Sequence, residues 1–383
     1  MKKILILVFS NLKHDARVMR QINFLKKNYA LTVCCFDIWP SDDYEVIIIP
    51  NQKLTFFRKC ISAVNLLLKR YSAANNILHP YKEYLRKAIA GQDFDLIIAN
   101  DVETLPLAFG INGNRSKVYF DAHEYAPRQF EDRLYWRIFF QGFNTYFCKT
   151  YIPHVSGMCT VNQGIANEYE KNFGIKPIII TNASKYVDIT PKLKENYPIK
   201  LVHHGIFTLS RQPDLMIDLI KLLDDRFTLD LIYLVPGAAS AKTKHYFEEF
   251  KIKALETGKI KILPPLKSTE IVPFLHDHYD VGIILIPPIN FNYENALPNK
   301  LFECIQARIG IAAGPLREIA AITKRYSIGV VSEAFTAQSL ASELIKLSLV
   351  DISRLKKNTE VAAGEMNAQY NEVLFLNAIE QII

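Results

Sequence analysis

Short apolar runs alternate with longer amphipathic stretches along this chain of 383 residues, and the alternation occurs twice. The runs are nearly continuous in apolar residues, as at 4–9 and 95–101, and a stretch with helical periodicity follows the first run at 16–27. Strands that are apolar on both faces are typical of parallel sheets covered by helices on both sides. We therefore predict an α/β fold with two doubly wound parallel-sheet domains that face a central cleft.

The two alternating halves are separated by the polar, proline-interrupted stretch 185–199, which we interpret as a linker. This places one domain at 1–186 and a second at 198–364, with a helical tail over about 335–383. Ligands of doubly wound folds bind at the carboxyl ends of the strands. The residues that directly follow each strand are therefore the candidates for function.

Several classes of protein are disfavoured by the motifs that are missing. No G-x-G-x-x-G follows a strand and no G-x-x-x-x-G-K-[ST] occurs, which disfavours standard NAD dehydrogenases and P-loop NTPases. The six cysteines form no C-x-x-C pair and no zinc spacing, so we expect a reduced, cytoplasmic protein without a metal site. The first apolar run is too short for a signal peptide, and no run reaches the ~18 apolar residues of a membrane span.

The net charge of +7 lies entirely in the first half of the chain. Residues 1–190 hold 24 Lys and Arg against 17 Asp and Glu, whereas the remaining residues hold 22 of each. The stretch 53–90 has eight basic residues and one acidic residue, and the run 133–151 mixes basic and aromatic residues. Both are typical of an interfacial helix on an anionic membrane. The alternatives are a solvated helix with an inward apolar face, and nucleic acid, which the neutral second half disfavours.

A strand, a glycine turn and a helix start follow one another at 203–216. Gly205 allows a tight turn, and Pro213 suits a first helical turn. Such a helix start favours phosphate, and Arg211 just before it can form two hydrogen bonds to a diphosphate. The alternative is an ordinary turn with a solvated arginine.

A second helix start at 292–307 carries the sharpest pattern in the sequence. Pro298 precedes Asn299, Lys300 and Glu303, which lie close to one helical face, while Leu301, Phe302 and Ile305 can face the core. A cation at the helix start suits a diphosphate, and a carboxylate one turn later suits the hydroxyls of a ribose. The alternative is a Lys–Glu surface pair worth a few tenths of a kcal/mol.

Polar residues also crowd the ends of strands in the first half. His123 and Glu124 directly follow the apolar run at 118–122, which makes them candidates for chemistry. A hydrogen-bonded structural histidine and a capping carboxylate are the alternatives. Four further residues that follow strands could line the same edge of the sheet, although each alone would suit a helix cap or the surface: Asp15, Arg17, Asp101 and Glu103.

Together these fragments resemble the bacterial GT-B glycosyltransferases of the large retaining family four. The resemblance covers essentially the whole chain. It rests on SNLKHDARVMRQINFL, NDVETLPLA, FDAHEYAP, VNQGIANEYEKNFGIKPIIITNAS, LVHHG…SR and ALPNKLFE…G, in this order. It implies an acceptor-binding Rossmann-like domain followed by a donor-binding one, with a terminal helix at 365–383 crossing back to the first.

The resemblance also implies roles for the donor-binding residues. Glu303 would hold the ribose of a nucleotide sugar, and Arg211 and Lys300 would bind its diphosphate, beside the turn at Gly205. The amides around Leu297, Pro298 and Asn299 would assist. Asn295 stands where the family has the first Glu of its E-x7-E motif, and Glu294 is one residue away. In the family that first Glu contacts the donor sugar.

The implied catalytic residues lie in the first domain. His123 would approach the transferred sugar, and Asp15 and Glu124 would lie near the acceptor or the reacting centre. We therefore expect a metal-independent, retaining hexosyltransferase that uses a UDP- or GDP-sugar as substrate and no cofactor. The expected acceptor is a lipid-linked or cell-surface glycan intermediate on the cytoplasmic face of the plasma membrane. The alternatives are a non-hydrolysing nucleotide-sugar epimerase and a non-catalytic scaffold of the same fold.

Overall fold

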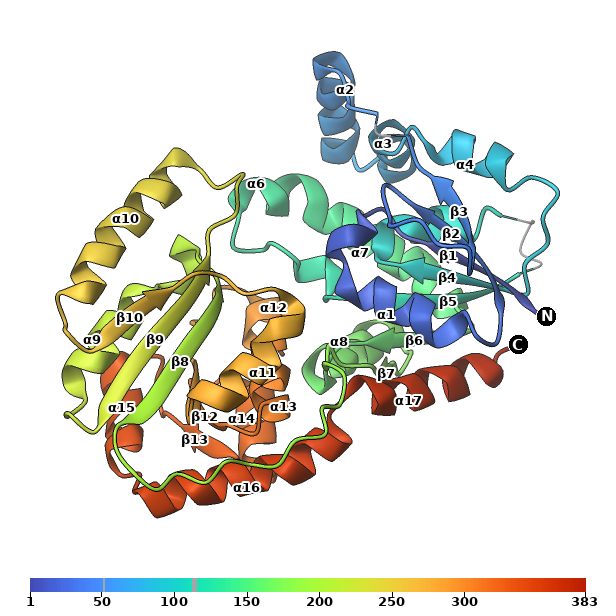
Figure 1. Ribbon diagram of the computed structural model, residues 1–383. Helices are drawn as coiled ribbons and strands as arrows, with labels where there is room; N and C mark the ends of the chain where they lie inside the picture. The colour runs from blue at the N-terminus through green and yellow to red at the C-terminus, as the bar shows by residue number, and fades with distance from the viewer. Residues whose placement is uncertain (51, 112–115) are drawn as a thin grey trace. The chain divides into compact units, whose positions relative to one another are not determined.

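The computed structural model describes residues 1–50, 52–111 and 116–383. By its contacts the chain divides into two compact units (Figure 1). Unit 1 comprises Met1–Thr181, Asn290–Asn292 and Glu372–Ile383. Unit 2 comprises Asn182–Ile289 and Tyr293–Asn371.

The described part of unit 1 is built on a parallel seven-stranded sheet with the order β3-β2-β1-β4-β5-β6-β7. The central strands are apolar on both faces, and Leu5, Ile97 and Phe120 are 0% exposed. This is the pattern expected of a parallel sheet with helices on both sides. The strands are β1 Lys3–Leu7, β2 Ala30–Cys35, β3 Glu45–Ile48, β4 Leu96–Asn100, β5 Lys117–Ala122, β6 Gly157–Thr160 and β7 Ile178–Ile179.

Helices cover both faces of this sheet (Figure 1). The helix α1 begins where the Asp15 carboxylate accepts a hydrogen bond from the Val18 amide, and α8 ends at Gly174 in the left-handed conformation, with φ of +72°. On the α1 side, Phe375 of α17 packs against Phe24 and Tyr119. The principal helices are α1 Ala16–Leu25, α2 Phe56–Leu67, α3 Tyr71–Leu78, α4 Lys82–Ala88, α5 Leu105–Ala108, α6 Leu134–Trp136, α7 Gly142–Tyr151, α8 Gln163–Phe173 and α17 Ala368–Glu380, of which the part from Glu372 belongs to unit 1.

The basic stretch 53–90 is not the single helical segment that its composition predicts. It forms the three helices α2, α3 and α4, and the first break falls at Lys69, whose φ is +56°. A left-handed residue cannot continue a right-handed helix, so the chain turns at this point. The amide of Lys69 donates to the carbonyl of Leu66, and that of Arg70 donates to Asn65.

Unit 2 is built on a parallel six-stranded sheet with the order β10-β9-β8-β11-β12-β13. The core on one face includes residues of α9, α10 and α15, and the core on the other includes residues of α11, α13, α14 and α16. The strands are β8 Ile199–Ile206, β9 Phe227–Leu234, β10 Ile260–Leu263, β11 Val281–Ile284, β12 Gly310–Ala313 and β13 Gly329–Val331. Both described sheets are parallel and doubly wound, which confirms the predicted fold class.

The helices of unit 2 include two that the sequence patterns did not single out, α10 and α14. The helix α11 begins at Ser268, and Lys267 is its N-cap. The principal helices are α9 Asp214–Leu222, α10 Ala241–Leu255, α11 Ser268–His278, α12 Phe291–Glu294, α13 Asn299–Gln306, α14 Arg317–Arg325, α15 Ala337–Ile345 and α16 Leu349–Glu365. The first two residues of α12, Phe291 and Asn292, belong to unit 1.

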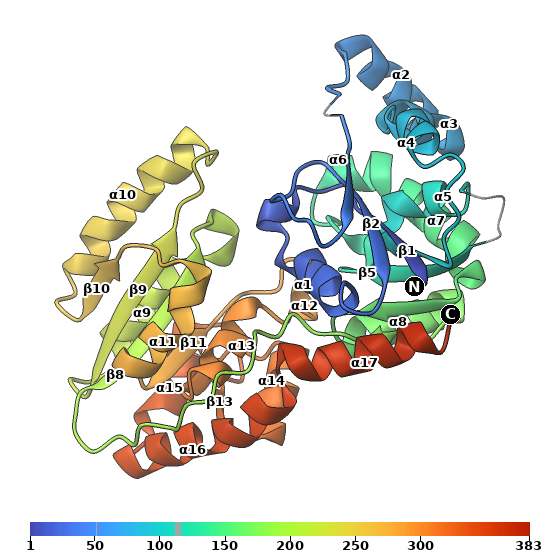
Figure 2. The same ribbon diagram turned by 45° about the vertical axis from the view of Figure 1, so that its right-hand side comes forward.

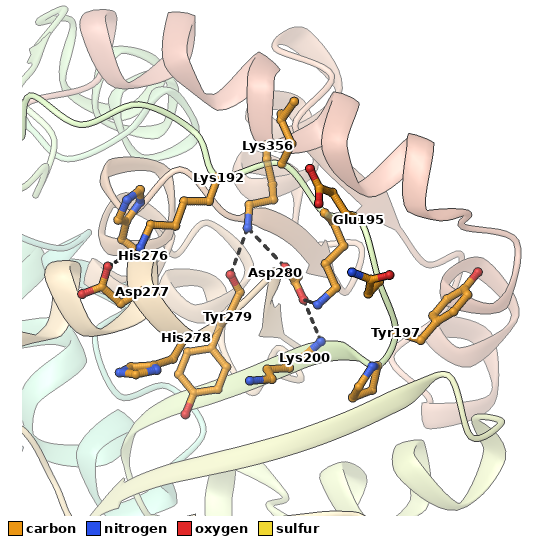
Figure 3. Close-up of a pocket in the computed structure, with 14 residues that line it drawn as sticks. Lys192, Glu195, Tyr197, Lys200, His276, Asp277, His278, Tyr279, Asp280 and Lys356 are labelled. Carbon is orange, nitrogen blue, oxygen red and sulfur yellow. Dashed lines mark hydrogen bonds and ion pairs between the residues drawn. The ribbon is translucent and has the colours of Figure 1, made fainter.

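The predicted linker 185–199 has no helix or strand before Ile199, which begins β8. Its residues 192–198 line a pocket with Lys200 and Asp280, at the amino-terminal ends of β8 and β11. Asp280, which precedes β11, binds the Nζ atoms of Lys194 at 2.9 Å and Lys356 at 3.2 Å, and accepts from the Lys200 amide. Figure 3 shows Asp280, Lys356 and Lys200 beside this pocket of about 520 Å³, which Lys194 also lines. Since ligands of such folds bind at the opposite, carboxyl edge, we interpret these ion pairs as fastening the linker.

Candidate functional site

The strand β8 lies in the middle of the second sheet and delivers two histidines and a glycine to its carboxyl end. Gly205 has φ of +130°, a conformation that residues with a Cβ rarely adopt. A Cβ on Gly205 would lie 3.5 Å from Lys300 Nζ and 3.8 Å from Arg211 Nη1. The bare backbone of Gly205 therefore lies directly beside two cationic side chains.

The helix α13 brings the predicted cation and carboxylate to this place. It begins at Asn299 with Pro298 as its N-cap, and it is anchored by Leu301, Phe302 and Ile305, all 0% exposed. This confirms the predicted helix and its core face, although Pro298 is the N-cap and the helix itself begins one residue later. Because Leu301, Phe302 and Ile305 hold the apolar face in the core, Lys300 and Glu303 lie on the part of the helix surface that does not pack in it.

Lys300 is buried, with 5% of the residue exposed, and its Nζ lies 3.4 Å from His203 Nε2. Burial, followed by the nearby charge of Arg211, lowers the pKa of Lys300 to about 7. The alternative of a Lys300–Glu303 surface pair is wrong. In the described part of the chain Lys300 forms no ion pair, and Glu303 contacts a different residue.

Glu303 is held by His204, whose Nε2 lies 2.7 Å from Glu303 Oε2. The Glu303 side chain is 15% exposed, and His204 is 7% exposed. A carboxylate fixed on one oxygen keeps lone pairs for a ligand on the rest of the group. The sequence alone gives neither histidine a role, although two adjacent histidines before Gly205 at the end of an apolar strand are a signal that could point to a site.

Arg211 ends a short 3₁₀ turn, Leu209–Arg211, that follows β8. Its Nη1 donates to the carbonyl of Ile206 at 3.4 Å, while its Nε is buried without a hydrogen-bond partner. A buried donor without a partner costs free energy unless a ligand supplies the acceptor. Pro213 is the N-cap of α9, one position before the predicted first turn, and it lines a small pocket with His203 and Arg211.

The loop before α13 distinguishes the two residues considered for the first position of the E-x7-E pattern. Asn295 is 4% exposed, whereas Glu294 is exposed to solvent. Leu297 is 8% exposed, and Asn299 is exposed at the start of α13. The buried position is therefore occupied by an amide, which can hydrogen-bond sugar hydroxyls without adding a negative charge.

In unit 1 a buried polar network joins β5 to α1 and β4. Arg17 contacts both Asp121 oxygens, the closest at 2.5 Å, and donates to the carbonyl of Ile180 at 2.6 Å. Gln21 donates to Asp121 at 3.0 Å and accepts from Asn100 at 3.1 Å. Burial would raise the pKa of Asp121, but the charge of Arg17 holds that pKa below its ordinary value. Arg17 is thus occupied in a structural pair.

His123 and Glu124 follow β5 as predicted and leave polar atoms without partners. His123 Nδ1 lies 3.5 Å from Asp101, and its Nε2 lies 4.0 Å from Asp121 without a hydrogen bond. Glu124 Oε2 is likewise buried without a partner. Burial, followed by the charge of Asp101, raises the pKa of Glu124 to about 7. One buried polar atom without a partner on each of these two side chains favours a site for chemistry over a fully satisfied structural role.

Asp15 has other partners at the start of α1. Its carboxylate accepts from the Val18 amide at 3.1 Å and from the Ser10 hydroxyl at 2.8 Å. Asp101 follows β4 with φ of +63°, and burial raises its pKa above the ordinary value. The structure thus places Asp15 as a helix cap, beside a sheet edge on which acidic groups gather.

Metal ions and membrane spans are considered for the described ranges, which omit residue 51 and 112–115. Within them, no three His, Cys, Asp or Glu side chains lie in a group that could hold a metal ion. No helix in these ranges combines the length and apolar character needed to cross a membrane.

Comparisons with known proteins identify the fold of the chain. No family profile matches the sequence, and no curated protein matches it. Among solved structures, sucrose-phosphate synthase from Thermosynechococcus elongatus is 10% identical, with a TM-score of 0.75 over 100% of this chain and 99% of that one. A UDP-forming α,α-trehalose-phosphate synthase from Burkholderia xenovorans is 12% identical, with a TM-score of 0.70 over 100% and 99%.

A third similar structure is HepE from Anabaena in complex with UDP-glucose, which is 14% identical with a TM-score of 0.67 over the whole of both chains. These neighbours are GT-B glycosyltransferases. At such low identity the likeness establishes the architecture, in agreement with the two parallel sheets described above. The chain has the GT-B fold of the glycosyltransferases.

Proposed function

We propose that the protein transfers a sugar from a nucleotide-diphosphate sugar to an acceptor hydroxyl, with retention of the anomeric configuration and without a metal ion. One observation carries the proposal. Lys300 and Arg211 lie beside the bare backbone of Gly205, and the His204-held carboxylate of Glu303 lies one helical turn from Lys300. Two cations suit a diphosphate, and a fixed carboxylate suits the two hydroxyls of a ribose.

In the transfer, the bond between the sugar's anomeric carbon and the diphosphate oxygen breaks, and a bond to the acceptor oxygen forms. Negative charge grows on the departing diphosphate. Lys300 and Arg211 would stabilise that charge, and their fixed positions mean that little reorganisation is needed at that moment. The buried Nε of Arg211 would gain the acceptor that it lacks. Asn295 would hydrogen-bond the donor sugar, and amides around Leu297–Asn299 would assist with the diphosphate.

We assign the acceptor and the proton transfer to unit 1. His123 and Glu124 have unpartnered polar atoms at the end of β5, and the pKa of Glu124, raised to about 7, suits a group that exchanges a proton near neutrality. Asp15 would shape the same edge of the sheet as the cap of α1. No side chain is assigned as a nucleophile, so the proposal includes no covalent intermediate.

We further propose that α2 docks unit 1 on the anionic cytoplasmic face of a membrane, where a lipid-linked or cell-surface glycan intermediate would be the acceptor. The helix stands out from the rest of unit 1 (Figure 1 and Figure 2). Phe56 is 83% exposed and Phe57 is 72% exposed, next to the basic Arg58 and Lys59. If the apolar face of α2 packed inward, as in the alternative of a solvated helix, the rest of the protein would cover these two rings. Exposed aromatic rings beside cations suit the boundary of an anionic bilayer. The run 133–151 offers a second surface, with Leu134 63% exposed.

A donor panel tests the enzymatic proposal. UDP- and GDP-sugars are compared by thermal shift and by hydrolysis, beginning with UDP-glucose because HepE from Anabaena was crystallised with it. The expected result is stabilisation by sugars of one base, together with slow release of the nucleoside diphosphate. If the protein converts a nucleotide sugar to its epimer without any acceptor, an epimerase function would replace the transferase proposal. No response to any nucleotide sugar would reject the enzymatic proposal.

Vesicle co-sedimentation tests the membrane proposal. The double variant Phe56→Ser/Phe57→Ser should lose binding to vesicles that contain anionic phospholipid, and so should neutralisation of Lys59 with Lys69, Arg70, Arg86 and Lys87. The matched control is Val350→Ser/Val361→Ser, because these α16 residues are 76% and 61% exposed without belonging to the basic surface. Equal binding by all variants would contradict membrane docking through α2.

A further inference from the structure

The hydrogen bonds of His203 fix which of its ring nitrogens carries hydrogen. His203 is 6% exposed, with Nδ1 2.9 Å from the carbonyl oxygen of Ile283 and Nε2 3.4 Å from Lys300 Nζ. Because a carbonyl only accepts, Nδ1 must be the donor. Burial, followed by the charge of Lys300, lowers the pKa of His203 well below its ordinary value, so the ring is neutral. The lone pair on Nε2 therefore faces Lys300.

The other groups around Lys300 do not compete for this role. Arg211 is a second cation, and Glu303 is engaged by His204. Burial raises the pKa of the Cys304 thiol, which is therefore neutral. In the described residues, the hydrogen-bond partner of Lys300 is thus a neutral acceptor and no carboxylate pairs with it.

We propose that His203 is a positioning residue for Lys300, whose side chain it holds beside Gly205 as either amine or ammonium, so that Lys300 takes up a proton when a diphosphate binds. This inference rests on the proposed donor site. A carboxylate in the place of His203 would keep Lys300 permanently charged and would compete with the ligand. A neutral imidazole leaves the charge available for the diphosphate alone.

The consequence is a defined dependence of affinity on pH. In the free protein, burial and Arg211 hold the pKa of Lys300 near 7. A bound diphosphate raises this pKa, because an adjacent anion favours the charged form. The affinity for the diphosphate is therefore highest below about pH 7, where Lys300 already carries its proton. It falls as the pH rises above this value, since Lys300 must then take up a proton from solvent on binding. The tautomer of His203 does not change.

The first experiment measures Lys300 in the free protein, without any nucleotide. Lysine side chains labelled with ¹³C at Cε are titrated by NMR, and the Lys300 signal is assigned as the one absent in Lys300→Met. We expect Lys300 to titrate near neutrality, and His203→Asp to move the titration toward the ordinary value of 10.5. A wild-type Lys300 that titrates near the ordinary value would overturn the proposal.

The second experiment measures proton uptake when UDP is titrated in buffers of different ionisation enthalpy. We expect uptake of up to about one proton per UDP above neutrality in the wild type. His203→Asp should abolish the uptake and weaken UDP at least about tenfold. His203→Gln, which can both donate to Ile283 and accept from Lys300, should restore most of the affinity. The matched control is His245→Asp, because the side chain of His245 is 78% exposed on α10.

The two experiments fail separately. If Lys300 titrates near neutrality but UDP does not bind, the donor function is rejected while the His203–Lys300 pairing stands. If UDP binds tightly with no proton uptake in the wild type, the donor function stands and the role of His203 is rejected. The uptake is compared between wild type and His203→Asp, so the titration of UDP's own phosphate is common to both.

Discussion

Gly205→Ala tests whether the bare backbone at the end of β8 is part of a ligand site. The new Cβ would lie 3.5 Å from Lys300 Nζ and 3.6 Å from Lys300 Cε, which are ordinary contacts, so overlap alone costs little. The φ of +130° is the larger problem, since a residue held in such a region costs about 1–3 kcal/mol. That corresponds to roughly a 5- to 150-fold shift in the unfolding equilibrium.

The ligand effect should exceed this stability effect, because the added methyl group occupies the surface between the two cations. We expect Gly205→Ala to remain folded in urea titrations and to lose at least about tenfold in UDP affinity by calorimetry. The matched control is Gly258→Ala, also in unit 2, where φ is +69° and no atom lies within 4 Å of the added Cβ. It should lose stability but keep its affinity. Wild-type affinity in folded Gly205→Ala would refute the reasoning.

Three further predictions concern carboxylates. Asp121→Asn should cost about 3–5 kcal/mol in urea unfolding, because it leaves Arg17 buried without its counter-ion, and a loss below 1 kcal/mol would contradict the buried pair. Glu124→Gln should flatten the pH dependence of the free energy of unfolding. The pKa of Glu124 is raised from 4.5 to about 7 in the folded state, so in the wild type this free energy falls as the pH rises through that window; an unchanged pH profile in the variant would contradict the raised pKa. Glu303→Gln should weaken UDP about tenfold or more but leave inorganic pyrophosphate unaffected, because only UDP has a ribose; equal losses would exclude the ribose contact.

The fold could be predicted from the sequence because the buried strands of a parallel sheet appear there as continuous apolar runs. The apolar run at 4–9 corresponds to β1, and the strand predicted before the turn at Gly205 is β8. The helix predicted at Pro298 begins one residue later, at Asn299. Short elements with weaker patterns were missed, as with β13, which has three partly exposed residues. The break at Lys69 was missed because a left-handed residue other than glycine has no reliable signal in the sequence.

The site was less accessible, because partners distant in the sequence decide what each residue does. Lys300 and Glu303 suggested a pair by their spacing, yet each contacts a histidine about 100 positions earlier, His203 and His204 respectively. Arg17 was placed beside the candidate groups, but Asp121 engages it in a buried pair. Spacing along a helix reports neighbours on that helix, and it carries no information on what the sheet places opposite.

The central claim, that the carboxyl end of β8 binds the diphosphate of a nucleotide, is tested most directly by calorimetric titration of UDP and GDP into the wild type and Lys300→Met. Methionine matches the buried stem of Lys300 without its charge, so the variant should fold. The account predicts that one of the two nucleotides binds the wild type and that Lys300→Met loses at least about tenfold in affinity for it. Equal affinity of the two proteins, or no binding of either nucleotide to the wild type, would contradict it.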